Sequence, residues 1–200
     1  QDGDYFLTSL LLQPLGANQA NSQNVKVDFL VKQKKQFKFK QWESEIGGDL
    51  CISKTIYFRQ KPMTVFLNAD AMGKSMQGAG GALIFGSVIR SILNRTQYSG
   101  NLLQTITPAE WLEDCYIELV KVFYSMQGTM SVSCILALLD DQKGHLFALN
   151  AGHPAPVLYR DGKASFLVED AVNQKIGESF AYEKIHNNNL KISSIQFEKD

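Results

Sequence analysis

The sequence predicts an α+β domain, because strand-like and helix-like patterns are interspersed along its 200 residues. Apolar and charged residues alternate over residues 34–40, which predicts a strand with one solvent-exposed face. Apolar residues recur at steps of three and four over residues 82–92, which predicts a helix that ends near Arg95. Residues 107–110, Thr-Pro-Ala-Glu, form a capping-box motif with proline at the first helical position, and they predict the start of a second helix.

Strands are predicted on both sides of these two helices. Residues 4–15 form an apolar run that ends at Pro14 and Gly16, which predicts a buried strand. Residues 17–24 are rich in asparagine, glutamine and serine, and they predict a loop. Residues 25–31 and 34–40 are expected to be two antiparallel strands. Further strands are expected at residues 51–59, 63–69, 131–139, 145–151, 156–160, 164–168 and 190–197, with turns at 140–144, 160–163 and 187–189.

The composition is that of an ordinary globular protein, with 44% hydrophobic and 20% charged residues. The formal net charge is zero, which argues against a dedicated nucleic-acid-binding protein. The longest apolar stretches are far shorter than the roughly 18 residues of a membrane span, and no signal peptide is visible. The chain lacks an initiating methionine, and no linker divides it. We therefore expect one domain over residues 1–200, a piece of a longer protein that can itself be membrane-anchored, with this segment cytoplasmic and without direct membrane contact.

The cysteines and histidines form no familiar metal or redox motif. Cys51, Cys115 and Cys134 are far apart and lie within apolar segments, with no Cys-x-x-Cys pair. The three histidines form no His-Glu-x-x-His motif. We therefore expect three reduced core thiols in a reducing compartment.

A lysine cluster and a glycine-rich segment each have a structural explanation. The lysines of residues 26–40 fit the solvated face of strands better than a site for an acidic partner, because alternation demands polar residues there. Residues 73–81 fail as a P-loop because Asn68 stands where its first glycine belongs, and as a dinucleotide-binding motif because Leu83 stands at the third glycine. Close packing of a helix start against a sheet is the favoured explanation.

Two aspartates are predicted to meet at one end of a β-hairpin. Residues 51–59 and 63–69 predict an antiparallel pair that turns near Gln60. The open end of this hairpin places Asp49 beside Asp70. Two carboxylates that close repel each other unless a cation lies between them, and Mg²⁺ or Mn²⁺ prefers such oxygen ligands. The pair could hold two metal ions for phosphoester hydrolysis, although the spacing alone is equally compatible with ordinary turn or cap residues.

Three short motifs together resemble one known family. They are Gly47-Gly48-Asp49, Asp70-Ala71-Met72-Gly73-Lys74-Ser75 and Asn150-Ala151-Gly152-His153-Pro154-Ala155-Pro156. In this order they resemble the metal-dependent PP2C-type (PPM) serine/threonine phosphatases. Within that family they are most similar to the bacterial sporulation phosphatases and stress regulators such as stage II sporulation protein E and RsbU. The resemblance runs from about residue 45 to residue 180 and favours the two-metal hypothesis over ordinary turn residues.

The resemblance implies an antiparallel β-sandwich of two sheets flanked by helices, in α-β-β-α layers. It implies that Asp49 and Asp70 are the catalytic carboxylates that bridge two Mn²⁺ or Mg²⁺ ions, and that the carbonyl of Ala71 joins them as a metal ligand. It also implies that the two predicted helices pack on the sheet, where such helices can regulate metal binding. Residues 150–156 would be a structural turn, in which His153 is a hydrogen-bonded turn residue.

The resemblance further implies a role in signalling. Family members commonly form the output domain of a sensor protein, and typical substrates are phosphoserine or phosphothreonine on small anti-anti-sigma-like (STAS) partners. A homodimer is one expected assembly. The chain departs from the family at Ser75, where glycine is usual. The family's further metal-binding aspartates would follow Asp200, so part of the metal site and one or more C-terminal sandwich strands are expected beyond it, and Glu178, Glu183 and Glu198 do not fit that pattern.

Three functional hypotheses follow from the sequence. The first is a metal-dependent protein phosphatase domain. The second is a catalytically silent relative that binds a signalling partner through the same surface. The third is a structural or dimerising sensor module in which Asp49 and Asp70 are ordinary turn residues.

Overall fold

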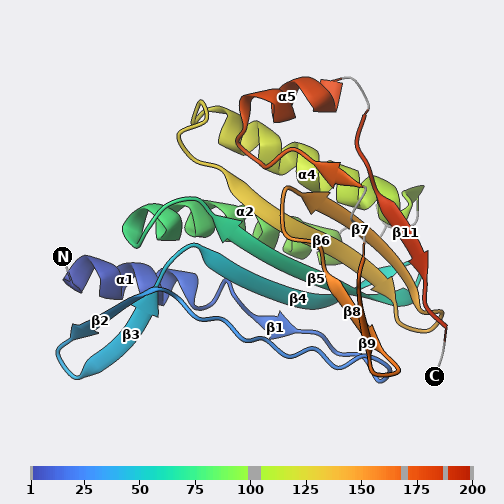
Figure 1. The fold of residues 1–200 in the computed structure, drawn as a ribbon, viewed down its shortest axis with the longest axis horizontal. Helices are drawn as coiled ribbons and strands as arrows, with labels where there is room; N and C mark the ends of the chain where they lie inside the picture. The colour runs from blue at the N-terminus through green and yellow to red at the C-terminus, as the bar shows by residue number, and fades with distance from the viewer. Residues whose placement is uncertain (1, 99–104, 168–170, 187–188, 199–200) are drawn as a thin grey trace.

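The computed structural model of the protein describes residues 2–98, 105–167, 171–186 and 189–198. Its largest element is a seven-stranded sheet, drawn in Figure 1. The long central strands pair antiparallel, and two short strands join the sheet in parallel. The strand order is β1 (Asn18–Gln19), β4 (Asp49–Phe58), β5 (Lys61–Ala71), β6 (Val132–Asp140), β7 (His145–Ala151) and β10 (Val172–Asn173), with β11 (Ser193–Gln196) also paired to β7.

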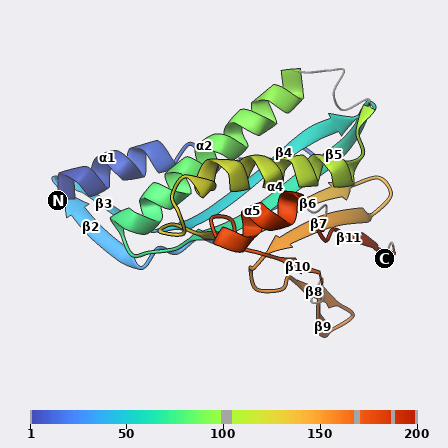
Figure 2. The same ribbon diagram turned by 90° about the horizontal axis from the view of Figure 1, so that it is seen from above.

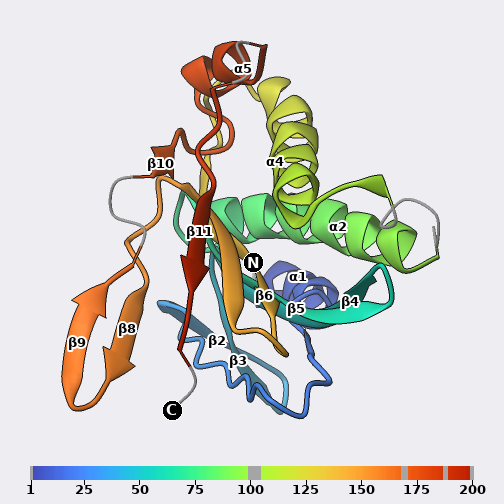
Figure 3. The ribbon, with the colours of Figure 1, turned by 90° about the vertical axis from the view of Figure 1, so that its right-hand side faces the viewer.

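Helices and two small ribbons surround this sheet. The long helices α2 (Met76–Tyr98) and α4 (Pro108–Tyr124) cover one face, as Figures 2 and 3 show. Helix α1 (Asp2–Leu12) packs against α2, and α5 (Ser179–His186) packs against α4. The ribbons lie on the side of the sheet away from α4, and they are formed by β2 (Lys35–Phe39) with β3 (Trp42–Ile46) and by β8 (Val157–Arg160) with β9 (Lys163–Phe166).

The hydrophobic core lies between the sheet and these long helices. Alternate residues of a strand point to the same face, and Ile52, Val65, Leu136 and Leu149 supply one fully or almost fully buried side chain from each central strand. Phe123 of α4 is completely buried against them. Burial of one such side chain contributes about 1.5–3 kcal/mol to stability. The same alternation directs the intervening residues of each strand to the opposite face.

Both predicted helices are confirmed, and the start of α4 is fixed by the predicted capping box. The Thr107 hydroxyl accepts a hydrogen bond from the Glu110 backbone N–H at 3.2 Å. The Glu110 carboxylate in turn accepts one from the Thr107 N–H at 2.6 Å. These bonds satisfy two backbone donors that a helix start would otherwise leave without partners.

The α+β class and most of the predicted strands are also confirmed, with small changes at the strand ends. The predicted loop at residues 17–24 is a loop except for β1. Residues 168 and 187–188, which end one predicted strand and begin one predicted turn, lie outside the described residues. Four elements were not predicted: β1, β3, β10 and α5.

The prediction of a buried strand at residues 4–15 is wrong, because this segment forms most of α1. A continuous apolar run cannot be assigned to strand or helix by periodicity, and its length is typical of a helix. Asp2 and Asp4 lie in the first turn, where negative charge favours a helix start. Tyr5 is buried against the second, smaller hydrophobic cluster with Phe37 of β2. The helix is therefore favoured by its length, its first-turn charge and its contacts with the ribbon.

The predicted pairing of residues 25–31 with residues 34–40 is also wrong. Residues 25–31 form no regular element, and β2 pairs instead with β3, which the sequence analysis missed. The turn between β2 and β3 is tight, because Phe39 and Trp42 are already cross-strand partners. Lys40 adopts a positive φ of 53° there, as two-residue hairpin turns require.

Helix α2 is the one helix among the described residues that is long and apolar enough to cross a membrane by length and composition. Half of its apolar window is buried within the fold, where it packs on the sheet. A helix at the core of a globular domain has the same properties.

Candidate metal centre

The two predicted acidic residues lie directly opposite each other at the open end of the β4–β5 hairpin. Asp49 and Asp70 are cross-strand partners in the register of β4 and β5. The Ala71 N–H donates to the Gly48 carbonyl at 3.0 Å, so Gly48 and Ala71, the next pair along the two strands, form a hydrogen-bonded pair. In an antiparallel ladder such pairs alternate with non-hydrogen-bonded pairs, whose Cα atoms lie about 4.5 Å apart and whose side chains are closest. Asp49 and Asp70 occupy that closer kind of pair.

Both carboxylates are exposed on the face of the sheet that points away from α2 and α4. The residues beside them in sequence, Leu50 and Ala69, are buried on the helix side. Partial burial, and to a lesser degree the facing carboxylate of Asp70, raises the pKa of Asp49. The Asp70 charge therefore makes ionisation of Asp49 less favourable, and a bound divalent cation would relieve this repulsion.

A backbone carbonyl packs closely against the residue before Asp49 because residue 48 is glycine. A Cβ atom at Gly48 would overlap the carbonyl oxygen of Ala71. Gly78 of α2 packs against the same point, since a Cβ there would lie 3.1 Å from the Gly48 nitrogen. The helix start and the strand end thus close on each other through glycines, as the sequence analysis expected for the glycine-rich segment. The Ala71 carbonyl oxygen lies in this close contact.

Two further polar side chains extend this site along the sheet. Ser133 of β6 is the cross-strand partner of Asp70, and its hydroxyl lies 3.0 Å from Nδ1 of His153. His153 is a hydrogen-bonded turn residue, as predicted: its N–H donates to the Asn150 side-chain oxygen at 2.8 Å, and Asn150 donates back to its carbonyl at 2.9 Å. The contact of the imidazole with Ser133 was not predicted, because no sequence motif gives a signal for it.

We expect the metal-free protein to lose stability as the pH falls below 6.5, the ordinary pKa of histidine, because burial lowers the pKa of His153. Asp70 opposes this lowering and Lys175 adds to it. A group with a lowered folded-state pKa binds protons more tightly when unfolded, so its contribution is present at higher pH and is lost as the pH falls through the folded-state value. His153→Gln should flatten this dependence when urea unfolding is measured over a pH series. Equal slopes for the variant and the parent protein would contradict the prediction.

The oxygen donors at this site suit a hard divalent cation. Among the residues that the structure describes, no group of three or more histidine, cysteine, aspartate or glutamate side chains could hold a metal ion. The site therefore offers two facing carboxylates, and the Ala71 carbonyl oxygen lies against Gly48, the residue before Asp49. Oxygen ligands of this kind fit Mg²⁺ or Mn²⁺ and would not favour a thiolate-binding metal.

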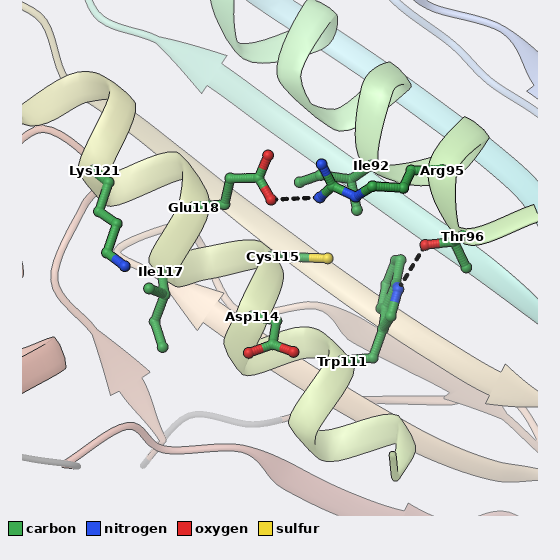
Figure 4. Close-up of a pocket in the computed structure, with 9 residues that line it drawn as sticks. All are labelled: Ile92, Arg95, Thr96, Trp111, Asp114, Cys115, Ile117, Glu118 and Lys121. Atoms are coloured by element: carbon green, nitrogen blue, oxygen red, sulfur yellow. Dashed lines mark hydrogen bonds and ion pairs between the residues drawn. The ribbon is translucent and has the colours of Figure 1, made fainter. Parts of the chain in front are cut away.

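A separate cavity of about 310 Å³ lies between α2 and α4 (Figure 4). Glu118 and Arg95 form an ion pair across it at 2.6 Å, and the Trp111 indole N–H donates to the Thr96 hydroxyl at 3.1 Å. These contacts join the two helices on the face of the sheet opposite to the aspartates. The cavity is therefore not part of the acidic site.

Comparison with protein families gives one match. Residues 61–183 match the family model described as Stage II sporulation protein E (SpoIIE), which covers more than half of the chain. The matched segment includes Asp70 and the turn at His153 but begins after Asp49. Comparison with curated protein sequences finds no match.

Several solved structures have a similar fold. The RsbU and RsbW domains of a Mycobacterium tuberculosis protein share 17% identity with a TM-score of 0.56, covering 78% of this chain and 37% of that one. A serine/threonine phosphatase of S. agalactiae shares 11% identity with a TM-score of 0.54, covering 78% and 73% of the two chains. A bacterial serine phosphatase shares 15% identity with a TM-score of 0.50, covering 82% and 68%. At such low identities these likenesses establish the fold.

Proposed function

The chain belongs to the stage II sporulation protein E family, and from this premise we propose that it is a PP2C-type phosphatase domain that hydrolyses phosphoserine or phosphothreonine on a signalling protein. The observation that carries the proposal is the register of β4 and β5, which sets Asp49 opposite Asp70. Its support is the similarity of the fold to a serine/threonine phosphatase and to RsbU domains.

Asp49 and Asp70 are the residues that would hold Mn²⁺ or Mg²⁺, with the Ala71 carbonyl as a third oxygen ligand, and two ions are expected. When bound, such ions supply Lewis-acid activation of water and of the phosphate group. The chain itself contributes the rigid placement of the carboxylates, because both lie on neighbouring strands of the sheet rather than on loops. Repulsion between the two carboxylates would favour the metal-bound site over the metal-free site.

The substrate and setting of the reaction are part of the same proposal. The RsbU likeness supports a phosphoprotein substrate in a signalling pathway, and a STAS-domain anti-anti-sigma factor is the partner we propose. The domain would act in the cytoplasm, where its three free cysteines stay reduced. The homodimer remains a prediction.

Metal removal tests the proposed reaction directly. We expect the protein to hydrolyse p-nitrophenyl phosphate and a phosphoserine peptide with Mn²⁺, to lose this activity with a chelator, and to regain it when Mn²⁺ is restored. Release of inorganic phosphate is the measurement. Activity that survives the chelator would contradict the proposal. Binding of a phosphorylated STAS protein without any hydrolysis would instead favour the catalytically silent module.

A further inference from the structure

Asp49 lies at the edge of the sheet, where its backbone groups face outward. It is the first residue of β4. Because the Asp49–Asp70 pair is non-hydrogen-bonded, the Asp49 N–H and C=O point away from β5. On this outer side, the described residues give β4 one strand partner, β1, which reaches it at Ser53 and Lys54. The backbone of Asp49 therefore has no strand partner on this side among the described residues.

The side chain of Gln33 supplies that partner. Its Nε2 donates a hydrogen bond to the Asp49 carbonyl at 2.8 Å. Its Oε1 accepts a longer one from the Asp49 N–H at 3.5 Å. One amide group thus binds the donor and the acceptor of the same residue, as a neighbouring β-strand would do. Gln33 itself belongs to the irregular segment between β1 and β2.

Gly47 makes room for this amide. A Cβ atom at position 47 would overlap Oε1 of Gln33 and would lie 3.0 Å from its amide carbon. Gly47 therefore has a different task from Gly48, whose missing side chain admits the Ala71 carbonyl. The two glycines before Asp49 open space on two sides of it, one for a side-chain amide and one for a backbone oxygen.

We propose that Gln33 is a positioning residue that holds the backbone of Asp49 at the sheet edge, so that its carboxylate stays opposite Asp70. The proposal rests on the proposed function for its consequence in metal binding. On its outer edge β4 has no strand partner at Asp49 among the described residues, and two like charges directly opposite each other on neighbouring strands are destabilising. The Gln33 amide opposes both effects. Partners that orient a metal ligand typically alter metal affinity by about 10–100-fold when they are removed.

Four variants test this role. Gln33→Ala removes the amide, and Gly47→Ala displaces it while leaving its chemistry intact. We expect each to weaken Mn²⁺ binding, measured by electron paramagnetic resonance of free Mn²⁺, by about tenfold or more. The double variant should bind no more weakly than Gly47→Ala alone, because both changes remove the same contact. Gln36→Ala, a matched change at an exposed position of β2, should leave the affinity unchanged.

A second measurement needs no metal. In Gln33→Ala the Asp49 amide should exchange its hydrogen faster than in the parent protein, with an unchanged midpoint of global unfolding. Gln33→Glu keeps the size of the side chain but loses the donor to the Asp49 carbonyl. It should therefore weaken Mn²⁺ binding and speed exchange of the Asp49 amide hydrogen as Gln33→Ala does. This variant provides the test if Gln33→Ala folds poorly. Unchanged amide exchange, fully additive effects in the double variant, or a Mn²⁺ affinity within about twofold of the parent protein in both Gln33 variants would overturn the proposal.

The two measurements separate this inference from the proposed function. If the parent protein binds no Mn²⁺ but the Asp49 amide loses protection in Gln33→Ala, the phosphatase proposal fails and the positioning role of Gln33 stands. If Mn²⁺ binds and supports hydrolysis equally in the parent protein and in both Gln33 variants, the phosphatase proposal stands and the role of Gln33 is refuted.

Discussion

Asp70→Asn is expected to lower Mn²⁺-dependent phosphate hydrolysis by at least about 100-fold, because loss of a ligand should cost no less than loss of a group that merely orients one. Asparagine keeps the shape of the side chain but removes its negative charge. The fold should survive, since Asp70 is exposed and its neighbours Ala69 and Ala71 carry the packing on the helix side. The measurements are the hydrolysis rate and the apparent Mn²⁺ affinity.

The matched control is Asp161→Asn, the same chemical change in the turn between β8 and β9. Asp161 is exposed and has a positive φ of 51°, a conformation that asparagine adopts readily. Its hydrolysis rate should equal that of the parent protein. If Asp70→Asn retained the parent rate, the acidic pair would not be the catalytic site, whatever the fold.

Asp70→Asn is also expected to affect the metal-free protein, where it should improve stability rather than impair a function. A raised folded-state pKa means that the stability contributed by Asp49 is present at low pH and is lost as the pH rises from the ordinary value of 3.8 through the raised value. Asp70→Asn removes the second cause of this rise, the facing charge. Without metal, the variant should therefore lose less stability over this range than the parent protein. Urea unfolding in a chelator over a pH series measures the difference.

Gly48→Ala is expected to destabilise the protein by about 1–3 kcal/mol and to impair Mn²⁺ binding as well. The added Cβ would overlap the Ala71 carbonyl, a backbone atom that cannot rotate away as a flexible side chain can. Relief of the overlap must move either β4 or the end of β5, and both carry a candidate carboxylate. The measurements are the free energy of unfolding in denaturant and the Mn²⁺ affinity.

Gly80→Ala provides a control of opposite sign. Gly80 lies within α2, and a Cβ there would meet nothing within 4 Å. Glycine in a helix interior is less favourable than alanine by about 0.5–1 kcal/mol, so this variant should be more stable than the parent protein. Equal stabilities for the two alanine variants would show that residue 48 is not constrained by the Ala71 carbonyl.

The sequence predicted the parts of the site that depend on local pattern. The positions of two apolar strands and of one short turn are sufficient to set a hairpin register, and that register alone brings Asp49 and Asp70 together. The start of α4 was equally predictable, because a capping box acts between residues three apart. The segment at residues 4–15 shows the limit of this reasoning, since its apolar run is compatible with a strand or a helix until its neighbours are known.

The contacts of Gln33 with Asp49 and of Ser133 with His153 were decided by the tertiary structure. Each joins residues 16 or 20 positions apart, through side chains that no periodicity or turn motif marks. Alternation and capping are short-range effects, so they are visible in the order of the amino acids. A hydrogen bond between an irregular segment and a sheet edge depends on how the whole chain folds back, and it becomes visible when that path is known.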